Sequence, residues 1–349
     1  MNVNYFLGAN SRGGFHSLYG SFCRGEGDFL HLIKAGPGGG KSGFMRRIAQ
    51  AAAERGYDTE CVLCSGDPDS LDAVYIPALR LGFMDATAPH ALEPELFAYN
   101  SDYVNLGRFC KRISDPRVGL YTDKYRAAYK EAYAYLAAAG SLDCMELSGL
   151  ISSETLEKVR KRAQSTARHE LGSVKKSNCA LRERQRFASC ISCKGELMLK
   201  EDIKKLCKRV YLLDDRCGLA KVYLEQMRRE ALSRGAETVL CLSPLCPEKP
   251  EALLLPEYEL GFASASVTEP DETWRHVRLD ALADPAAKRS SREALRRRDK
   301  LWHELLGEAV RLLASAKAYH DELERVYNPH IDFAALDAFT DETINAAFK

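Results

Sequence analysis

A glycine-rich stretch near the start of the chain carries residue types that hold phosphate groups. It reads Ala35-Gly-Pro-Gly-Gly-Gly-Lys-Ser42 and follows a strand-like apolar run at residues 28–34. A helix-like segment at residues 44–55 comes next and is closed by Gly56. A strand, a loop that ends in Gly-Lys-Ser and a helix together match the phosphate-binding P-loop pattern. The strict pattern has Gly where this chain has Ala35, and a broader form of it also admits Ala.

The residue types explain how this loop would hold a nucleotide. Its glycines permit a tight turn in which backbone N–H groups surround a phosphate, whereas an ordinary glycine-rich turn is the alternative. Lys41 would reach the β- and γ-phosphates, and Ser42 would bind Mg²⁺ through its hydroxyl at the positive end of the helix. We therefore predict ATP and Mg²⁺ as ligands. The predicted nucleotide-binding residues are Gly36, Pro37, Gly38, Gly39, Gly40, Lys41, Ser42 and Gly43.

An acidic residue at the end of a neighbouring strand is the second requirement of P-loop enzymes, because it holds the hydration shell of Mg²⁺. Asp85 is the best candidate, since it ends the apolar-biased, strand-like segment 79–84 and precedes a polar turn. The alternative for Asp85 is a turn-forming role. We predict Lys41 and Asp85 as catalytic residues and Ser42 and Asp85 as metal ligands.

Further polar residues would lie at the same edge of the predicted sheet. Asp67, Asp69 and Asp72 follow a strand-like segment at residues 59–65. They either form a turn rich in aspartate or take part in catalysis or substrate binding. His90 could polarise a phosphate or order a water molecule.

The chain also contains an internal repeat. Residues 55–83 align with residues 234–262 without a gap, and 10 of these 29 positions are identical. Composition alone would give roughly two identities at ordinary residue frequencies. With a shift of one residue the alignment extends backwards, so that Lys41 meets Lys221.

The second copy lacks most of the groups that would bind phosphate and metal in the first. Arg216 replaces Gly36, Ala220 replaces Gly40, Val222 replaces Ser42 and Ser264 replaces Asp85. We therefore predict a degenerate, non-hydrolytic second unit and one ATP per chain. The surviving Lys221 and its neighbour Arg216 either belong to the packing of their own unit or reach the first site as accessory cations.

Helical patterns follow each α/β unit and set the predicted domain organisation. The expected fold class is α/β, with two tandem P-loop-type units, each with an appended α-helical region. The first domain is expected at 1–183, with its helical region at about 91–183. The second is expected at 184–349, with its α/β part at about 184–266 and its helical region at about 267–349. The main helices are expected at 121–139, 153–168, 292–327 and 341–348.

Composition narrows the classes of partner. Lys and Arg number 50 and Asp and Glu number 49, so a net charge of +1 provides no general attraction to nucleic acid or an anionic membrane. The chain has no run of 18 apolar residues and no signal-like start, so we expect a cytoplasmic protein whose 12 cysteines are reduced. The basic cluster at residues 296–300 is expected to be a solvated helix face; the alternatives are a lid arginine and a nucleic-acid contact.

These motifs together resemble an uncharacterised bacterial family of tandem P-loop ATPase-like proteins. The shared stretches are Phe-Leu-Gly-Ala-Asn at residues 6–10, the Gly-Lys-Ser loop, the acidic stretch 67–72 and the stretch 85–90. The likeness covers most of the chain and implies a P-loop NTPase fold that binds ATP, although it supplies no substrate. The second unit of that family usually keeps a glycine-rich loop of its own, so Ala220 and Val222 depart from the pattern.

Three functions follow from these predictions. The leading one is a Mg²⁺-dependent ATPase or ATP-driven switch that uses the single P-loop of the first unit. The second is a P-loop kinase that phosphorylates a small molecule or nucleotide, with residues 67–72 near the acceptor. The third is a module that binds nucleotide without hydrolysis and recognises a protein partner through the helical regions. No Glu follows Asp85 directly, which disfavours the strongly hydrolytic ATPases.

Overall fold

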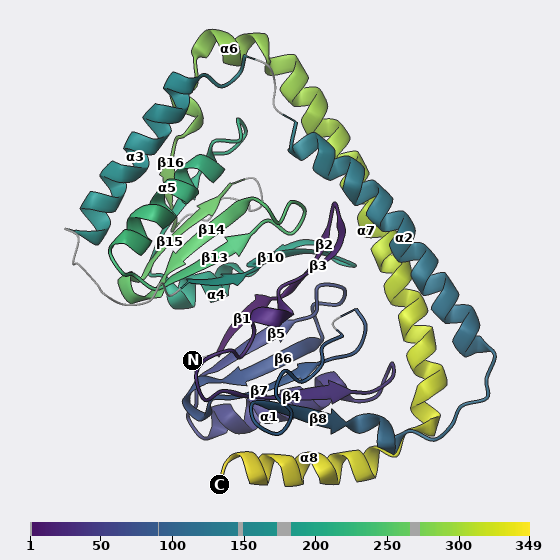
Figure 1. The fold of residues 1–349 in the computed structure, drawn as a ribbon. Coiled ribbons are helices and arrows are strands. Elements are labelled where there is room, and N and C mark those ends of the chain that lie inside the picture. The colour runs from purple at the N-terminus through teal and green to yellow at the C-terminus, as the bar shows by residue number, and fades with distance from the viewer. Residues whose placement is uncertain (1, 90, 146–148, 173–182, 266–272) are drawn as a thin grey trace.

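The chain forms two α/β units, with two long helices running along one side of both (Figure 1). The mixed α/β class predicted from the sequence is confirmed, and each unit contains a six-stranded mixed sheet. This computed structural model describes residues 2–89, 91–145, 149–172, 183–265 and 273–349. His90, one of the predicted site residues, lies outside the described residues.

The sheet of the first unit positions the glycine loop, which we define as residues 35–42. In sheet order its strands are β1 (Asn2–Phe6), β5 (Thr59–Leu63), β6 (Leu71–Ile76), β7 (Leu81–Asp85), β4 (Phe29–Lys34) and β8 (Ser101–Asn105). Strand β6 runs antiparallel to both neighbours, and the other pairs are parallel. Helix α1 (Lys41–Glu54) follows the loop and buries Phe44, Met45 and Ile48 against the sheet, because residues three and four apart share one helix face.

The sheet of the second unit repeats this topology. Its strands are β9 (Glu183–Arg186), β13 (Thr238–Leu242), β14 (Pro250–Leu255), β15 (Leu260–Ser264), β12 (Arg209–Leu213) and β16 (Arg275–Val277), in that order. Each pair has the direction of its counterpart in the first unit. The register of β5 and β6 shifts between Val62 and Leu63, and that of β13 and β14 shifts between the aligned residues Cys241 and Leu242. The repeat seen in the sequence therefore extends to the geometry of the backbone.

Equivalent residues also meet where the two units join. A hairpin of β2 (Gly8–Ser11) and β3 (Gly14–Ser17) follows the first edge strand, and β10 (Ser189–Ser192) and β11 (Gly195–Met198) form its counterpart. Phe6 and Phe187, which precede the two hairpins, exchange two backbone hydrogen bonds of 2.9 Å each. Because equivalent residues pair with each other, the two units are related by an approximate two-fold axis.

The helical regions cross between the units. Helices α2 (Arg117–Asp143) and α7 (Arg292–Tyr327) lie side by side and run in opposite directions (Figure 1). After α2, helix α3 (Ser153–Leu171) packs on α5 (Ala220–Ser233) of the second unit, whereas α8 (Phe333–Ala347), which follows α7, packs on α1 of the first. The 27 residues of α2 span about 40 Å, long enough to carry the chain from one unit to the other. Each unit is thus covered by the helix that follows the other one.

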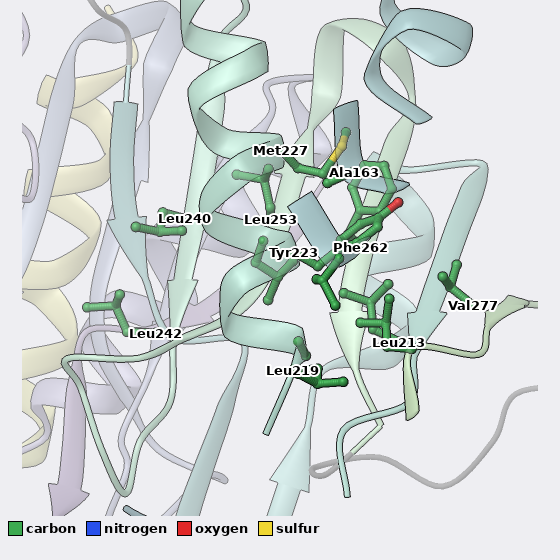
Figure 2. Packing of buried hydrophobic residues seen from close by; sticks show 14 of the residues in the cluster. Ala163, Leu213, Leu219, Tyr223, Met227, Leu240, Leu242, Leu253, Phe262 and Val277 are labelled. Carbon is green, nitrogen blue, oxygen red and sulfur yellow. The ribbon is translucent and has the colours of Figure 1, made fainter. Parts of the chain in front are cut away.

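The core of the second unit shows why α3 docks there. Tyr223 and Met227 of α5, together with Leu219 just before it, face the sheet and belong to one cluster with Phe262 of β15 (Figure 2). On the outer side, buried Val159, Ala163 and Ala167 recur every fourth residue along α3, so a stripe of small side chains faces α5. This stripe lets the two helices approach closely.

Shorter helices complete the fold. These are α4 (Lys200–Leu206) and α6 (Pro285–Ser290), the latter capped by the side chain of Asp284. Among the described helices, none combines the length and the apolar composition that crossing a lipid bilayer requires.

Candidate functional site

The glycine loop connects the carboxyl end of β4 with the first turn of α1. Gly38 and Gly40 adopt φ angles of +64° and +77°, a left-handed conformation in which other residues are strained. A Cβ atom added to Gly39 would lie 2.7 Å from the Cβ of Ala35. The curvature of the loop therefore depends on glycine at three successive positions.

Lys41 and Asp85 are brought together by the parallel pairing of β4 and β7. In this register Asp85 lies opposite Ile33, two residues before the loop begins. The Nζ atom of Lys41 lies 3.5 Å from Oδ2 of Asp85 and 3.2 Å from each carbonyl oxygen of Ala35 and Gly36. Both side chains are largely buried, so the ion pair lies in a region of reduced dielectric.

The remaining contacts of this cluster involve hydroxyl and amide groups. The Asp85 carboxylate accepts hydrogen bonds from the backbone N–H and the hydroxyl of Thr87, at 2.8 and 2.5 Å. The hydroxyl oxygen of Ser42 accepts a hydrogen bond of 2.9 Å from the backbone N–H of Leu71, at the start of β6. A cation, a carboxylate and a hydroxyl thus surround the N-terminus of α1.

The three predicted aspartates of residues 67–72 have separate surroundings. Asp72 is buried and accepts a hydrogen bond of 2.5 Å from the hydroxyl of Tyr19, which is itself fully buried. Asp69 forms an ion pair with Lys194 in the hairpin of the second unit. Asp67 lies 3.5 Å from Nζ of Lys317 on α7. Asp67 therefore connects this stretch with α7.

Helix α7 contributes polar side chains that are not among the site residues predicted from the sequence. Lys317, His320 and Glu324 occupy one face of the helix, at spacings of three and four residues. The ring of His320 lies against that of Tyr125 of α2, with the ring planes tilted by 46°, and its Nδ1 lies 3.6 Å from Oε1 of Glu324. Burial lowers the pKa of His320. The positive charges of Lys317 and Lys41 lower it further, whereas the negative charge of Glu324 raises it. The spacing of these residues was the available signal, but it did not indicate which unit they would face.

The end of α7, the turn that follows it and α8 lie directly over the glycine loop. In each case a Cβ atom added to a loop glycine would lie closer than van der Waals contact to an atom of one of these segments. The distances are 3.0 Å from Gly36 to Cε1 of Tyr327, 2.7 Å from Gly38 to Oδ1 of Asn328 and 3.0 Å from Gly40 to Cδ1 of Leu336. The loop is therefore in contact with the C-terminal part of the chain.

His320, Asp321 and Glu324 also form a group whose ligand atoms lie within 4.8 Å of one another, close enough to share a metal ion. Asp321, however, already forms an ion pair of 2.5 Å with Lys317.

Arg298 does not lie at the glycine loop as the predicted alternative of a lid arginine would require. It donates a hydrogen bond to the backbone carbonyl of Arg216 in the second unit.

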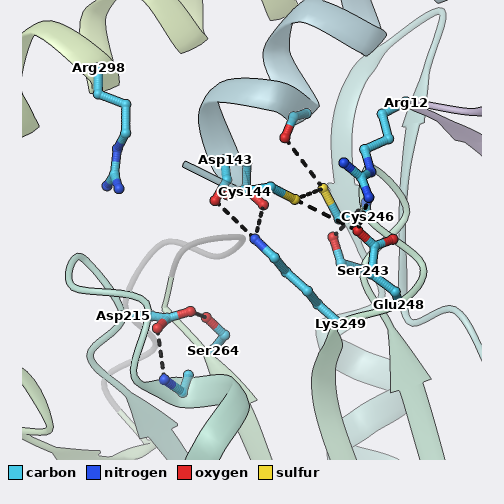
Figure 3. Close-up of polar contacts among 12 residues, drawn as sticks. Arg12, Asp143, Cys144, Asp215, Ser243, Cys246, Glu248, Lys249, Ser264 and Arg298 are labelled. Carbon is cyan, nitrogen blue, oxygen red and sulfur yellow. Dashed lines mark hydrogen bonds and ion pairs between the residues drawn. The ribbon is translucent and has the colours of Figure 1, made fainter. Parts of the chain in front are cut away.

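The corresponding loop of the second unit contains its own anion (Figure 3). One oxygen of the Asp215 carboxylate accepts a hydrogen bond of 2.8 Å from the backbone N–H of Ala220, at the N-terminus of α5, and the other accepts one of 2.9 Å from the hydroxyl of Ser264. Burial raises the pKa of Asp215 to about 7. Arg216 forms an ion pair of 3.0 Å with Asp299 of α7. A side-chain carboxyl thus takes the place at the helix N-terminus where a phosphate would bind.

Comparison with known proteins gives no relative from which a function could be transferred. No family model, no curated protein and no solved structure matches this chain. The geometry of the two loops is therefore the feature of this protein that points to a function.

Proposed function

We propose that the first unit binds Mg·ATP and that the protein is an ATPase or an ATP-driven switch with a single P-loop. The observation that carries the proposal is the glycine loop between β4 and α1, with Lys41 3.5 Å from Asp85 at its base. This combination of backbone N–H groups, a lysine and a helix N-terminus suits a polyphosphate. Lys41 would exchange the carbonyl oxygens of Ala35 and Gly36 for phosphate oxygens.

The side chains near the loop also suit Mg²⁺. Ser42 and Asp85 offer a hydroxyl and a carboxylate, and Mg²⁺ prefers oxygen ligands of this kind. When bound, the ion would neutralise negative charge on the phosphates. The residues of the chain would position the nucleotide and compensate its charge. Lys317, held by Asp67 beside this site, is a second cation that α7 could supply.

The contacts of α7 and α8 with the loop support the switch. Tyr327, Asn328 and Leu336 touch the three glycines that would wrap the phosphates. A nucleotide that enters the loop would change these contacts, and α7 would carry the change along its length. The second unit, with Asp215 at its helix N-terminus, would serve as a non-hydrolytic partner.

Calorimetric titration with Mg·ATP tests the site. Lys41→Ala should lower the affinity at least tenfold, about 1.4 kcal/mol, because it removes the cation nearest the phosphates. Lys130→Ala, an exposed position on α2, is the matched control and should bind like the wild type. Undiminished Mg·ATP binding by a folded Lys41→Ala protein would show that the site is assigned wrongly.

ADP release separates the possible reactions. The purified protein should release ADP from ATP alone if it is an ATPase. Release only in the presence of a pool of metabolites would identify a kinase. Negligible release combined with nucleotide-dependent capture of a partner would identify a binding module. For the switch, Mg·ATP should alter amide hydrogen exchange at the end of α7 and in α8, and unchanged exchange there would refute it.

A further inference from the structure

A cavity of about 770 Å³ lies in the second half of the molecule, away from the glycine loop. It is bounded by the loop that contains Asp215 and by the end of α2 around Asp143 (Figure 3). The first turns of α7, with Trp302, form another side of it. Glu251 of β14 also lines it. Relative to the second sheet, the cavity thus lies where the glycine loop meets its covering helix in the first unit.

Two buried polar groups in the cavity wall have no hydrogen-bond partner within the described part of the chain. The first is the carboxyl group of Glu251, whose two oxygens both lack a partner, and the second is the indole Nε1 of Trp302. Glu251 is only 2% exposed. Leaving a buried polar group unsatisfied costs about 1–3 kcal/mol, so the protein maintains these groups at the expense of stability.

The first unit shows what a purely structural acid would look like at this position. Asp72 is the residue that aligns with Glu251 in the repeat. It is equally buried, yet the hydroxyl of Tyr19 donates to it at 2.5 Å. Glu251 receives no hydrogen bond of normal geometry from the described residues, and the nearby hydroxyl of Ser189, also without such a bond, only moderates its raised pKa. Its carboxylate is therefore available to a ligand in the cavity.

The charges around the cavity define the kind of ligand. Its lining includes seven residues with carboxylates and four lysines or arginines. The basic residues are partly committed, since Lys249 binds Asp143 at 2.7 Å and Arg216 binds Asp299 at 3.0 Å. Burial raises the pKa of Glu251 to about 8 and that of Asp215 to about 7, so these two carboxyl groups are wholly or partly protonated at neutral pH. The other five still outnumber the four basic groups, which opposes a phosphate and favours a cation. Apolar side chains, including Leu150, Ile151 and Ile191, form another part of the wall.

We propose that this cavity, which we term the amine pocket, binds a small organic cation with an ammonium or guanidinium group. The cationic group would donate hydrogen bonds to Glu251, and the apolar part of the ligand would lie against Ile191 and the indole of Trp302. In the free protein Glu251 is protonated at neutral pH, and a bound cation would lower its pKa, displace this proton to solvent and form a charge-assisted hydrogen bond with the carboxylate. The second unit would therefore be a ligand-binding unit in its own right, independent of whether the first unit binds ATP.

Paired probes that share one body and differ in charge test the proposal. Phenethylamine and phenethyl alcohol differ in an ammonium and a hydroxyl group, and their binding can be followed by calorimetry. The chain contains two tryptophans, so a fluorescence change that disappears in Trp302→Phe would place the probe in the amine pocket. Putrescine and agmatine extend the set to a diamine and a guanidinium compound.

The proposal predicts a charge-dependent preference. Phenethylamine should bind at least tenfold more tightly than phenethyl alcohol. Glu251→Gln, which keeps the shape but cannot ionise when the cation binds, should weaken amine binding about 10- to 100-fold, the contribution of a hydrogen bond to a charged group. Glu225→Gln, on the exposed face of α5, is the matched control and should bind like the wild type.

Three results would overturn the proposal. One is equal affinity for the amine and the alcohol. Another is amine binding that is unchanged in folded Glu251→Gln. The third is the absence of binding by phenethylamine, putrescine and agmatine at about 10 mM, roughly ten times the dissociation constant of about 1 mM that marks weak binding.

Discussion

Replacing Glu251 with glutamine should stabilise the protein at neutral and alkaline pH. Burial is the main cause that raises the pKa of this carboxyl to about 8; the hydroxyl of Ser189 acts against it, and the charges of Glu196 and Asp143 add to it. In the native protein the group is therefore protonated at neutral pH. Glutamine has the shape of the protonated form and does not ionise, so the substitution leaves the folded state nearly unchanged.

The magnitude follows from the two pKa values. In the unfolded chain the carboxyl has the ordinary pKa of 4.5, whereas in the native state it titrates at about 8. Between these values the native state holds a proton that the unfolded chain has released, so stability is greatest below pH 4.5 and falls as the pH rises towards 8. At about 1.4 kcal/mol per pKa unit, the loss is roughly 3 kcal/mol near neutral pH and about 5 kcal/mol above pH 8.

Urea unfolding followed by circular dichroism measures this difference. The free energies of unfolding of the wild type and Glu251→Gln should agree within about 1 kcal/mol near pH 5 and diverge to about 3 kcal/mol at neutral pH, with the variant more stable. Glu225→Gln should follow the wild type throughout. Parallel curves for the wild type and Glu251→Gln from pH 5 to 8 would refute the assignment of Glu251 as a buried, protonated acid.

Three further predictions concern the first site, the second loop and the packing of α2. Asp85→Asn should weaken Mg·ATP binding more than metal-free ATP binding, because the carboxylate is proposed to act through Mg²⁺; equal losses in calorimetry would reassign Asp85 to structure. Equilibrium binding should give one ATP per chain, and Arg216→Ala should leave turnover unchanged because this side chain pairs with Asp299; two equivalent ATP molecules or a loss of turnover would contradict this. The thiol sulfurs of Cys144 and Cys246 lie 3.4 Å apart, so mild oxidation should join the end of α2 to the second unit. A mobility shift on a non-reducing gel, abolished in Cys144→Ser, would detect the link, and no shift would argue against the crossing of the helices.

Local patterns were sufficient to predict the elements around the glycine loop. The strand expected at residues 28–34 is β4, and the helix expected at 44–55 is α1, which begins three residues earlier at Lys41. The helix expected at 292–327 has those bounds in α7. These predictions succeeded because a strand, a glycine turn and an amphipathic helix are encoded by neighbouring residues. The repeat was visible for a similar reason, since aligned positions do not depend on the fold.

The partners of the site were decided by tertiary structure. Tyr327 and Asn328 contact the glycine loop although they lie almost 290 positions further along the chain. Helical periodicity defines which residues of α7 share a face, but it contains no information about the surface that this face meets. The docking of α3 on α5 depends on small side chains at the contact, whereas α8 docks on α1 through aromatic side chains such as Phe44 and Phe339. Both contacts also depend on the length of the crossing helices. Asp215 likewise satisfies the helix N-terminus only once the loop has folded around it. Sequence periodicity thus determined the local elements, while packing between distant segments determined which side chains surround each loop.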